Sequence, residues 1–371
     1  LLAKKLFENS SLATHHSSLK NIALLAMFFL AISPWHIQFS RVGFEATVGL
    51  FAATASITAF LYGLSDKKWL IVSAIALGLS SYTYHTQRIF VPFLFIATFL
   101  IFKDQIFKIS KKYLAGFLIT TILISLPLVI LIPPRVILQR FEVTTGRPKL
   151  EDIEKSIKFI LQDREAESPL GHIIHNRRFV IGQTYFGNYL SHFDFNFLWT
   201  RGDDNFRHHI GDMGMLYLFE LPLVIFGVYH LLRYKTKSSI FLLAWLIVAP
   251  VAATPATPNP HANRSLPLVI AFEIISAYSI ITLLSLKFPQ KKLITLAFTI
   301  WIIASFLIYT HNYFVHYPVE KASFWQYGYR EAVLESEKIK GEFPKILIDR
   351  TIEQAYAFWL FNTEYDPEKY Q

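Results

Sequence analysis

Nine apolar stretches separated by short loops constrain this chain more than any other feature of its sequence. They cover residues 22–39, 44–63, 69–84, 89–102, 113–132, 213–232, 240–254, 266–286 and 293–310. A helix of about 20 apolar residues crosses a bilayer, and shorter spans fit where a helix is buried or the bilayer is locally thin. Hydrophobic residues form 53% of the chain and charged residues only 17%. A soluble helical protein would need more polar surface, so we expect an all-α polytopic membrane protein.

Lysine in the connections predicts the orientation of these spans. Every second connection is short and basic, at residues 66–68, 103–112, 233–237 and 287–292, and Lys4, Lys5 and Lys20 precede the first span. The positive-inside rule places these segments in the cytoplasm and the intervening connections outside. The net charge of +9 therefore reflects topology, and no interleaving of basic and aromatic residues indicates a nucleic-acid partner. The chain has no cysteine, which excludes disulfides and thiolate metal sites.

The spans divide the chain into four regions. Residues 1–132 form a transmembrane region of five spans, 133–211 a long extracytoplasmic loop, and 212–310 a second region of four spans. Within the loop, apolar residues at helical spacing over 151–161 predict an amphipathic helix lying on the membrane. Residues 311–371 are expected to begin a small extracytoplasmic α/β domain, with a buried strand at 345–349 and a helix at 355–360. Because the chain begins at Leu1 within a basic connection, we interpret it as an N-terminally truncated fragment.

Three clusters on the expected outer face carry the candidate chemistry. Arg41 and Glu45 lie four residues apart, a spacing that pairs side chains on one helix face. They could orient a polar or phosphorylated substrate at the rim of a cavity, or form a plain ion pair at a helix end. Ionisable groups at membrane depth are costly and are functional candidates.

The second cluster is the tight turn 82–88, which contains Tyr84, His85 and Arg88. Arginine binds phosphate through two parallel hydrogen bonds, so this turn could hold an anion. An aromatic belt with one snorkelling arginine is the simpler alternative.

The third cluster follows the proline-rich segment 254–260 and contains His261, Asn263 and Arg264. A loop stiffened by three prolines and carrying an outside arginine fits an anion site, although a helix cap with solvated charges would look similar. His208 and His209 with Asp203 and Asp204 are a weak metal candidate, because their spacing matches no fixed ligand motif. No phosphate-binding loop or nucleophile elbow occurs.

These segments together resemble bacterial family 39 glycosyltransferases, relatives of the protein O-mannosyltransferases and of the aminoarabinose transferase of lipid A. The resemblance rests on residues 33–45 (SPWHIQFSRVGFE), the turn 82–88 with the following IFVP, residues 197–208 (FLWTRGDDNFRH) and 261–264 (HANR). It implies a GT-C helix bundle in the bacterial plasma membrane with its active face outside. It also implies inverting transfer of a sugar from a polyprenyl-phosphate donor to a protein, lipid or glycan acceptor.

The resemblance also implies residue roles. The family's catalytic Asp lies in the first outside loop, which this chain does not contain, and Glu45 resembles the second acidic position, so a supporting role is expected for it. Substrate contacts are expected from Arg41, Tyr84, His85, Arg88, His261, Asn263 and Arg264, with Arg88 and Arg264 on the leaving phosphate. No cofactor is indicated; a divalent metal is possible in GT-C enzymes but nothing in the sequence requires one.

Two other classes remain open at this point. A transporter or flippase would also surround a cavity with polar clusters, but should place ionisable residues at mid-depth in several spans and often contains inverted repeats. A non-catalytic membrane scaffold would not need three arginine-containing clusters on one face. The sequence identifies neither the sugar nor the acceptor.

Overall fold

The computed structural model describes residues 1–8, 16–133, 150–255, 258–287, 289–343, 345–349 and 354–370. Within these ranges the chain is helical and forms no strand. It divides into two compact units, Leu1–Phe306 and Leu307–Gln371. The expectation of an all-α polytopic protein is confirmed.

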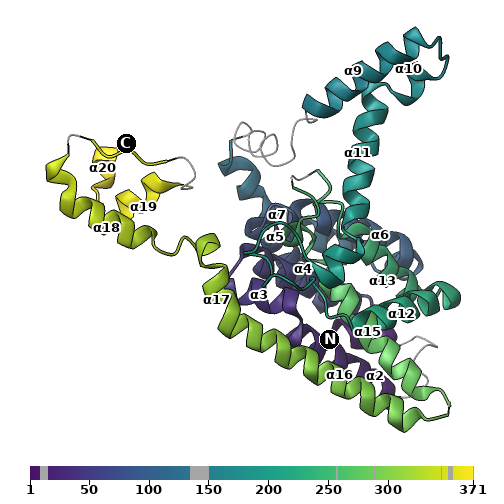
Figure 1. The fold of residues 1–371 in the computed structure, drawn as a ribbon. Coiled ribbons are helices and arrows are strands. Elements are labelled where there is room, and N and C mark those ends of the chain that lie inside the picture. The colour runs from purple at the N-terminus through teal and green to yellow at the C-terminus, as the bar shows by residue number, and fades with distance from the viewer. Residues whose placement is uncertain are drawn as a thin grey trace. The chain divides into compact units, whose positions relative to one another are not determined.

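The first unit is a helix bundle in which each of the nine apolar stretches contains a helix (Figure 1). Its first half comprises α1 (Leu2–Phe7), α2 (His16–Ile32), α3 (Pro34–Val42), α4 (Glu45–Gly63), α5 (Lys68–Thr83), α6 (Gln87–Ile106) and α7 (Lys111–Leu131). Its second half comprises α12 (Glu220–Tyr234), α13 (Lys237–Val248), α14 (Ala262–Ser265), α15 (Leu268–Ser285) and most of α16 (Lys291–His311).

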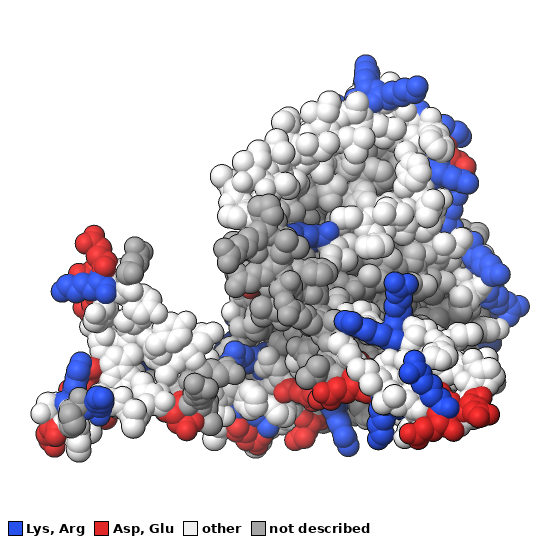
Figure 2. Space-filling view, turned by 90° about the horizontal axis from the view of Figure 1, so that it is seen from above, with Lys and Arg blue, Asp and Glu red and all other residues white. Residues whose placement is uncertain are grey.

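Among the described residues, five helical segments are long and apolar enough to cross a membrane: α4, α6, α7, α15 and the run Lys291–Glu320. The pair α2 and α3 counts as a sixth if the two form one bent span. In α7 most side chains are apolar and only Phe117 is buried, and many are exposed, for example Leu123 at 63% and Ile130 at 69%. Figure 2 shows a broad surface without Lys, Arg, Asp or Glu. Such a surface is stable against hydrocarbon rather than water.

A bend of 59° separates α2 from α3 at Ser33 and Pro34. Proline has no N–H to donate, so the end of α2 needs other partners, and the Tyr217 hydroxyl donates to the Ile32 carbonyl at 2.8 Å. Gly43 then ends α3 in the left-handed conformation at φ 75°. Arg41 therefore lies in α3 and Glu45 begins α4. The prediction that these two share one helix face was wrong, because the glycine breaks the helix between them. Whether the two side chains pair stays a prediction.

The expected amphipathic helix is confirmed as α9 (Leu150–Glu165), which is followed by α10 (Gly171–Ile174) and α11 (Arg177–Ser191). The Ser156 hydroxyl donates to the His175 carbonyl at 2.6 Å, and the His175 ring lies 2.5 Å from the Asp163 carboxylate. These bonds join α9 to the segment before α11. Whether α9 lies on a membrane stays a prediction.

The second unit contains short helices, some of which are joined by side-chain hydrogen bonds. They are the π-helix η2 (Asn312–His316), α17 (Tyr317–Glu320), the 3₁₀ helices η3 (Ala322–Trp325) and η4 (Lys340–Glu342), α18 (Tyr329–Ile339), α19 (Ala355–Asn362) and α20 (Pro367–Tyr370). The Trp359 indole donates to Glu337 at 2.7 Å, which joins α19 to α18. The expected helix over 355–360 is confirmed as α19.

The expected buried strand at 345–349 was wrong. These residues form no strand, and Leu347 is 94% exposed. An apolar run alone does not make a strand, because its backbone needs a partner strand to bond, and none lies among the described residues. The domain boundaries themselves stay predictions.

Candidate functional site

The centre of the candidate site is a buried carboxylate, Asp203, in the segment that follows the π-helix η1 (Asn196–Thr200). Asp203 is only 7% exposed. One of its oxygens, Oδ2, lies 2.5 Å from His208 Nδ1 and also accepts the backbone N–H of Ala262 at 2.9 Å. Charge-assisted bonds of this kind are strong. Asp203 therefore ties its own loop to the start of α14.

Two histidines complete the loop around Asp203. The backbone N–H of Gly211 donates to His209 Nδ1 at 3.1 Å, so the other ring nitrogen carries the proton and donates to the Asp203 carbonyl at 2.7 Å. The His208 ring stacks on Phe39 at 5.3 Å between centroids and lies 5.3 Å from the His261 ring. The loop is thus held by hydrogen bonds on one side and aromatic contacts on the other.

Helix α3 holds this network from the side of the first spans. The Trp35 indole, fully buried, donates to the Ala262 carbonyl at 3.3 Å, and the Gln38 amide donates to the Arg207 carbonyl at 2.8 Å. The bend between α2 and α3 gives α3 the direction that brings both side chains to these carbonyls. Trp35 and Asp203, which are far apart in the sequence, thus both bond to Ala262 and fix the position of α14.

Burial sets the charge state of the histidines beside Asp203. Burial, together with the charges of the neighbouring His208 and Arg264, lowers the pKa of His261 to about 3. Burial likewise lowers the pKa of His192 to about 4. Burial acts to raise the pKa of Asp203, but the bonds from His208 and the Ala262 N–H outweigh it and hold that pKa below its usual value. Asp203 is therefore ionised near neutral pH, and His192 and His261 are neutral.

His192 connects the segment after α11 to α14. The backbone N–H of His261 donates to His192 Nε2 at 3.2 Å, so Nδ1 carries the proton and donates to the Asn188 carbonyl at 2.9 Å. This arrangement requires the neutral ring that its low pKa provides.

Of the residues predicted from sequence, the structure brings together Tyr84, Glu45 and Arg264. Arg264 lies in α14 and is 9% exposed. Burial raises the pKa of Tyr84, which caps the end of α5; a hydrogen bond from Arg264 and its charge oppose this, and the charge of Glu45 raises the pKa further. A phenol from the first half of the chain therefore meets a guanidinium from the second half. His261 and Asn263 adjoin Arg264 on α14 and its cap, as expected.

The remaining predicted residues lie at or near helix ends that are predicted to face outside. Arg88 is exposed in the first turn of α6, and its Nε donates to the Ser81 carbonyl at 2.9 Å. The His85 ring packs 4.2 Å from the Tyr84 ring. Arg41 is exposed near the end of α3. Through its bond to Ser81, Arg88 also stabilises the turn between α5 and α6.

Sequence reasoning missed several polar side chains buried at the same helix ends. Gln87 is 1% exposed, and within the described residues neither its amide nitrogen nor its amide oxygen forms a hydrogen bond. The buried hydroxyls of Thr47 and Thr86 also have no hydrogen-bond partner there. Buried polar groups usually have partners, so such atoms near a candidate site indicate a place for a bound polar molecule or water. A polar run at the start of an apolar helix was the only signal available in the sequence.

Asp203, His208 and His261 are also the residues that could hold a metal ion. Each offers one ligand atom, and these atoms lie within 4.8 Å of one another. However, the 2.5 Å separation of His208 and Asp203 is a hydrogen-bond distance, and the same oxygen already accepts the Ala262 N–H. This geometry fits a hydrogen-bond network better than a ready set of metal ligands.

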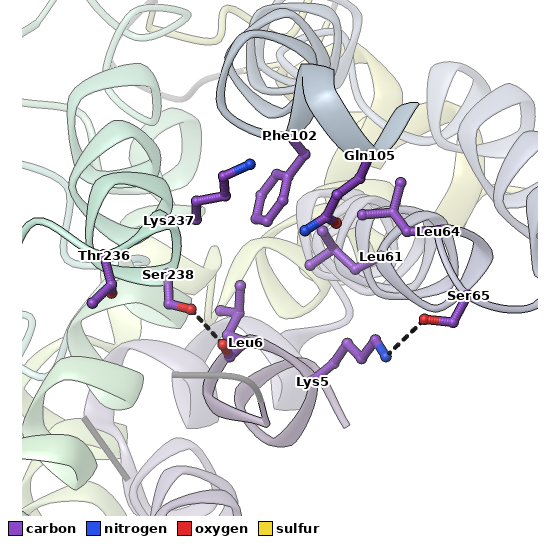
Figure 3. A pocket seen from close by; sticks show the side chains of 10 residues that line it. All are labelled: Lys5, Leu6, Leu61, Leu64, Ser65, Phe102, Gln105, Thr236, Lys237 and Ser238. Atoms are coloured by element: carbon purple, nitrogen blue, oxygen red, sulfur yellow. Dashed lines mark hydrogen bonds between the residues drawn. The ribbon is translucent and has the colours of Figure 1, made fainter. Parts of the chain in front are cut away.

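A cavity of about 320 Å³ lies at other helix ends and contains none of the predicted site residues (Figure 3). It is lined by Lys5, Leu6, Leu61, Leu64, Ser65, Phe102, Gln105, Thr236, Lys237 and Ser238. Its lysines are engaged, Lys5 with Glu8 and Lys237 with Asp104. Lys5, Lys237 and Asp104 belong to the segments predicted to be cytoplasmic.

The helices and the buried network define a multi-pass membrane protein with an arginine-containing polar site between its spans. Residues 14–130 match the model of the dolichyl-phosphate-mannose-protein mannosyltransferase family. The match covers less than a third of the chain but includes Arg41, Glu45, Tyr84, His85 and Arg88. It supports a membrane glycosyltransferase of the GT-C type. No curated protein and no solved structure matches the chain.

Proposed function

We propose that this protein transfers a sugar from a polyprenyl-phosphate donor to a hydroxyl of a protein, lipid or glycan on the outer face of a bacterial plasma membrane. The observation that carries the proposal is the buried Arg264, bonded to Tyr84, which the charge of Glu45 also reaches, together with a segment that matches a mannosyltransferase family. A lipid-linked sugar phosphate brings an apolar tail and an anion, which suit a charged site between membrane spans.

In the proposed reaction the acceptor oxygen attacks the anomeric carbon and the bond from that carbon to the phosphate oxygen breaks. The polyprenyl phosphate leaves with the bonding electrons, and the acceptor proton passes to a carboxylate. The family resemblance assigns that carboxylate to the first outside loop, and Glu45 supports it. Arg264 and Arg88 stabilise the charge that grows on the phosphate, an interaction stronger in the transition state than before it. The neutral His261 would contact the donor without repelling the arginines.

A transport function is the second candidate, because the bundle buries two carboxyls. Glu220 and Glu273 are 1% and 2% exposed, in α12 and α15. Buried acidic residues within spans are typical of transporters. A flippase would move the intact donor without breaking it.

One reconstitution distinguishes the two functions. The full-length protein is placed in liposomes with a polyprenyl-phosphate sugar labelled in the sugar, together with an acceptor-containing membrane extract. Transfer predicts release of free polyprenyl phosphate and label on the acceptor. Movement of intact donor between leaflets, without release of polyprenyl phosphate, would favour transport and contradict the proposed function.

A further inference from the structure

Two glutamates from different helices meet in the interior of the bundle. Glu220 is the first residue of α12, Glu273 lies in the second turn of α15, and their carboxyls are in hydrogen-bonding contact. Both are almost fully buried. Among the described residues, no lysine, arginine or histidine pairs with either carboxyl. The sugar-transfer reaction proposed above does not use this pair.

Five oxygen atoms meet at this place, and four of them make no hydrogen bond of normal geometry within the described part of the chain. Glu220 Oε1 accepts the backbone N–H of Tyr217 at 3.0 Å. The other Glu220 oxygen and both Glu273 oxygens make no hydrogen bond of normal geometry to a donor. The Ser33 hydroxyl, 1% exposed, lies beside Glu273 and is also without a bond of normal geometry. Ser33 caps α3 at its break from α2, so three separate segments supply these atoms.

Two ionised carboxylates cannot stay in contact here. Like charges a few ångströms apart repel strongly in a medium of low polarity, and burial without a counter-charge adds a desolvation cost for each. A single proton removes the repulsion, as in other carboxyl pairs that titrate as one unit. Protonated Glu220 Oε2 would donate to one Glu273 oxygen, and the second Glu273 oxygen would accept the Ser33 hydroxyl. One proton thus gives all four oxygens a partner.

A bound divalent cation fits these atoms less well. Calcium takes six to eight oxygen ligands and magnesium six, usually with several waters. The five oxygens that meet here, one of them a serine hydroxyl, fall short of either number. A proton needs only the two carboxyls that are already in contact.

We propose that Glu220 and Glu273 form a proton-binding site, in which a carboxylic acid donates to a carboxylate and one proton is shared. The other polar groups that face the pair are Ser33, from the break between α2 and α3, and Tyr217, whose hydroxyl donates to the Ile32 carbonyl at the same break. Ser33 begins the helix whose Trp35 and Gln38 hold the loop around Asp203. The proton therefore supports the bend that positions the candidate site.

Infrared spectroscopy of the purified full-length protein tests this proposal directly. In a detergent without ester groups, the wild type at neutral pH should show the carbonyl band of a buried protonated carboxylic acid, with a shift in D₂O. Glu220→Gln and Glu273→Gln should each abolish this band. In each variant the glutamine amide donates to the remaining carboxylate, so that carboxylate needs no proton. Glu337→Gln, in the second unit, is the control and should leave the band unchanged.

Thermal stability gives a second readout that does not require the spectra. Alkaline pH should lower the Tm of the wild type more than that of either glutamine variant, because only the wild type then holds two adjacent charges. Absence of the acid band in the wild type would overturn the proposal, as would its persistence in both variants. A wild type without the band, whose Tm rises on addition of Na⁺ or Ca²⁺ but does not rise in the variants, would identify a cation site instead.

Discussion

At the residue scale, the site depends on how Arg264 is held. Its guanidinium is 9% exposed and bonds to the Tyr84 hydroxyl, and the neutral His261 adjoins it. A buried charge needs such polar partners, because an unpaired charge in the interior is very costly. In the proposed reaction, these partners would fix the direction of the guanidinium before the donor binds, as electrostatic catalysis requires.

Removing the Tyr84 hydroxyl tests this positioning. Tyr84→Phe keeps the ring and deletes one hydrogen bond to a charged group, a bond that contributes on the order of 1.5–3 kcal/mol. We expect sugar transfer by the full-length protein to slow by about tenfold, with little change in folded yield. Tyr365→Phe, in the second unit, is the control and should transfer at the wild-type rate. Equal rates for Tyr84→Phe and wild type would show that the phenol does not position Arg264.

Arg88 supplies a second test, because its bond to the Ser81 carbonyl allows a structural role as well as the proposed role in binding phosphate. If it stabilises the leaving phosphate, Arg88→Ala should slow transfer by on the order of 10²–10³ at equal folded protein. Arg88→Lys should recover only part of this rate, since an ammonium keeps the charge but lacks the planar fork. A purely structural arginine would give near-normal turnover in both purified variants, and that result would remove Arg88 from the phosphate site.

The lowered pKa values of His192 and His261 predict how the stability of the folded protein depends on pH. His192 and His261 have folded-state pKa values of about 4 and 3, below their ordinary value near 6.5. The unfolded chain therefore binds protons that the folded protein excludes, so stability should fall as pH falls from about 6.5 toward 4. Asp203, with its pKa below the usual value, should add a loss only at lower pH. Melting in detergent across this range should show a shallower decline for His192→Gln, and an identical decline would contradict the assignment.

At the scale of helices, the sequence predicted which segments are helical but not how they meet. Apolar runs of sufficient length were enough to locate a helix in each of the nine stretches. The break at Gly43 was missed because spacing alone paired Arg41 with Glu45. Asp203 was considered only as a weak metal ligand, since its bond to Ala262 joins residues 59 apart that nothing in the sequence connects. The contact between Glu220 and Glu273 was missed for the same reason.

Close packing at a glycine supplies a test at this scale. A Cβ at Gly227 in α12 would lie 2.4 Å from Ser279 Oγ and 2.5 Å from Ile275 Cγ2, both on α15. Gly227→Ala should therefore destabilise the bundle by about 1–3 kcal/mol through overpacking. Gly182→Ala, in α11 where nothing lies within 4 Å, is the matched control and should be neutral or slightly stabilising. A Tm for Gly227→Ala at or above that of the control would contradict the close approach of α12 and α15.

At the scale of the whole molecule, the proposed function requires the basic loops and the candidate site to lie on opposite sides of a membrane. The chain contains no cysteine, so single cysteines can report topology without background. An impermeant thiol reagent on whole cells should label Ser168→Cys and not Ser65→Cys. Labelling at position 65 but not at 168 would reverse the orientation.

The most direct test of the central claim is the rate of sugar transfer by Arg264 variants of the purified full-length protein. We expect Arg264→Ala to release polyprenyl phosphate from a polyprenyl-phosphate sugar on the order of 10²–10³ more slowly than wild type, with partial recovery in Arg264→Lys. Arg233→Ala, in a connection predicted to be cytoplasmic, should match the wild type. A wild-type rate in Arg264→Ala, at equal folded protein, would contradict the claim that this buried arginine serves the leaving phosphate.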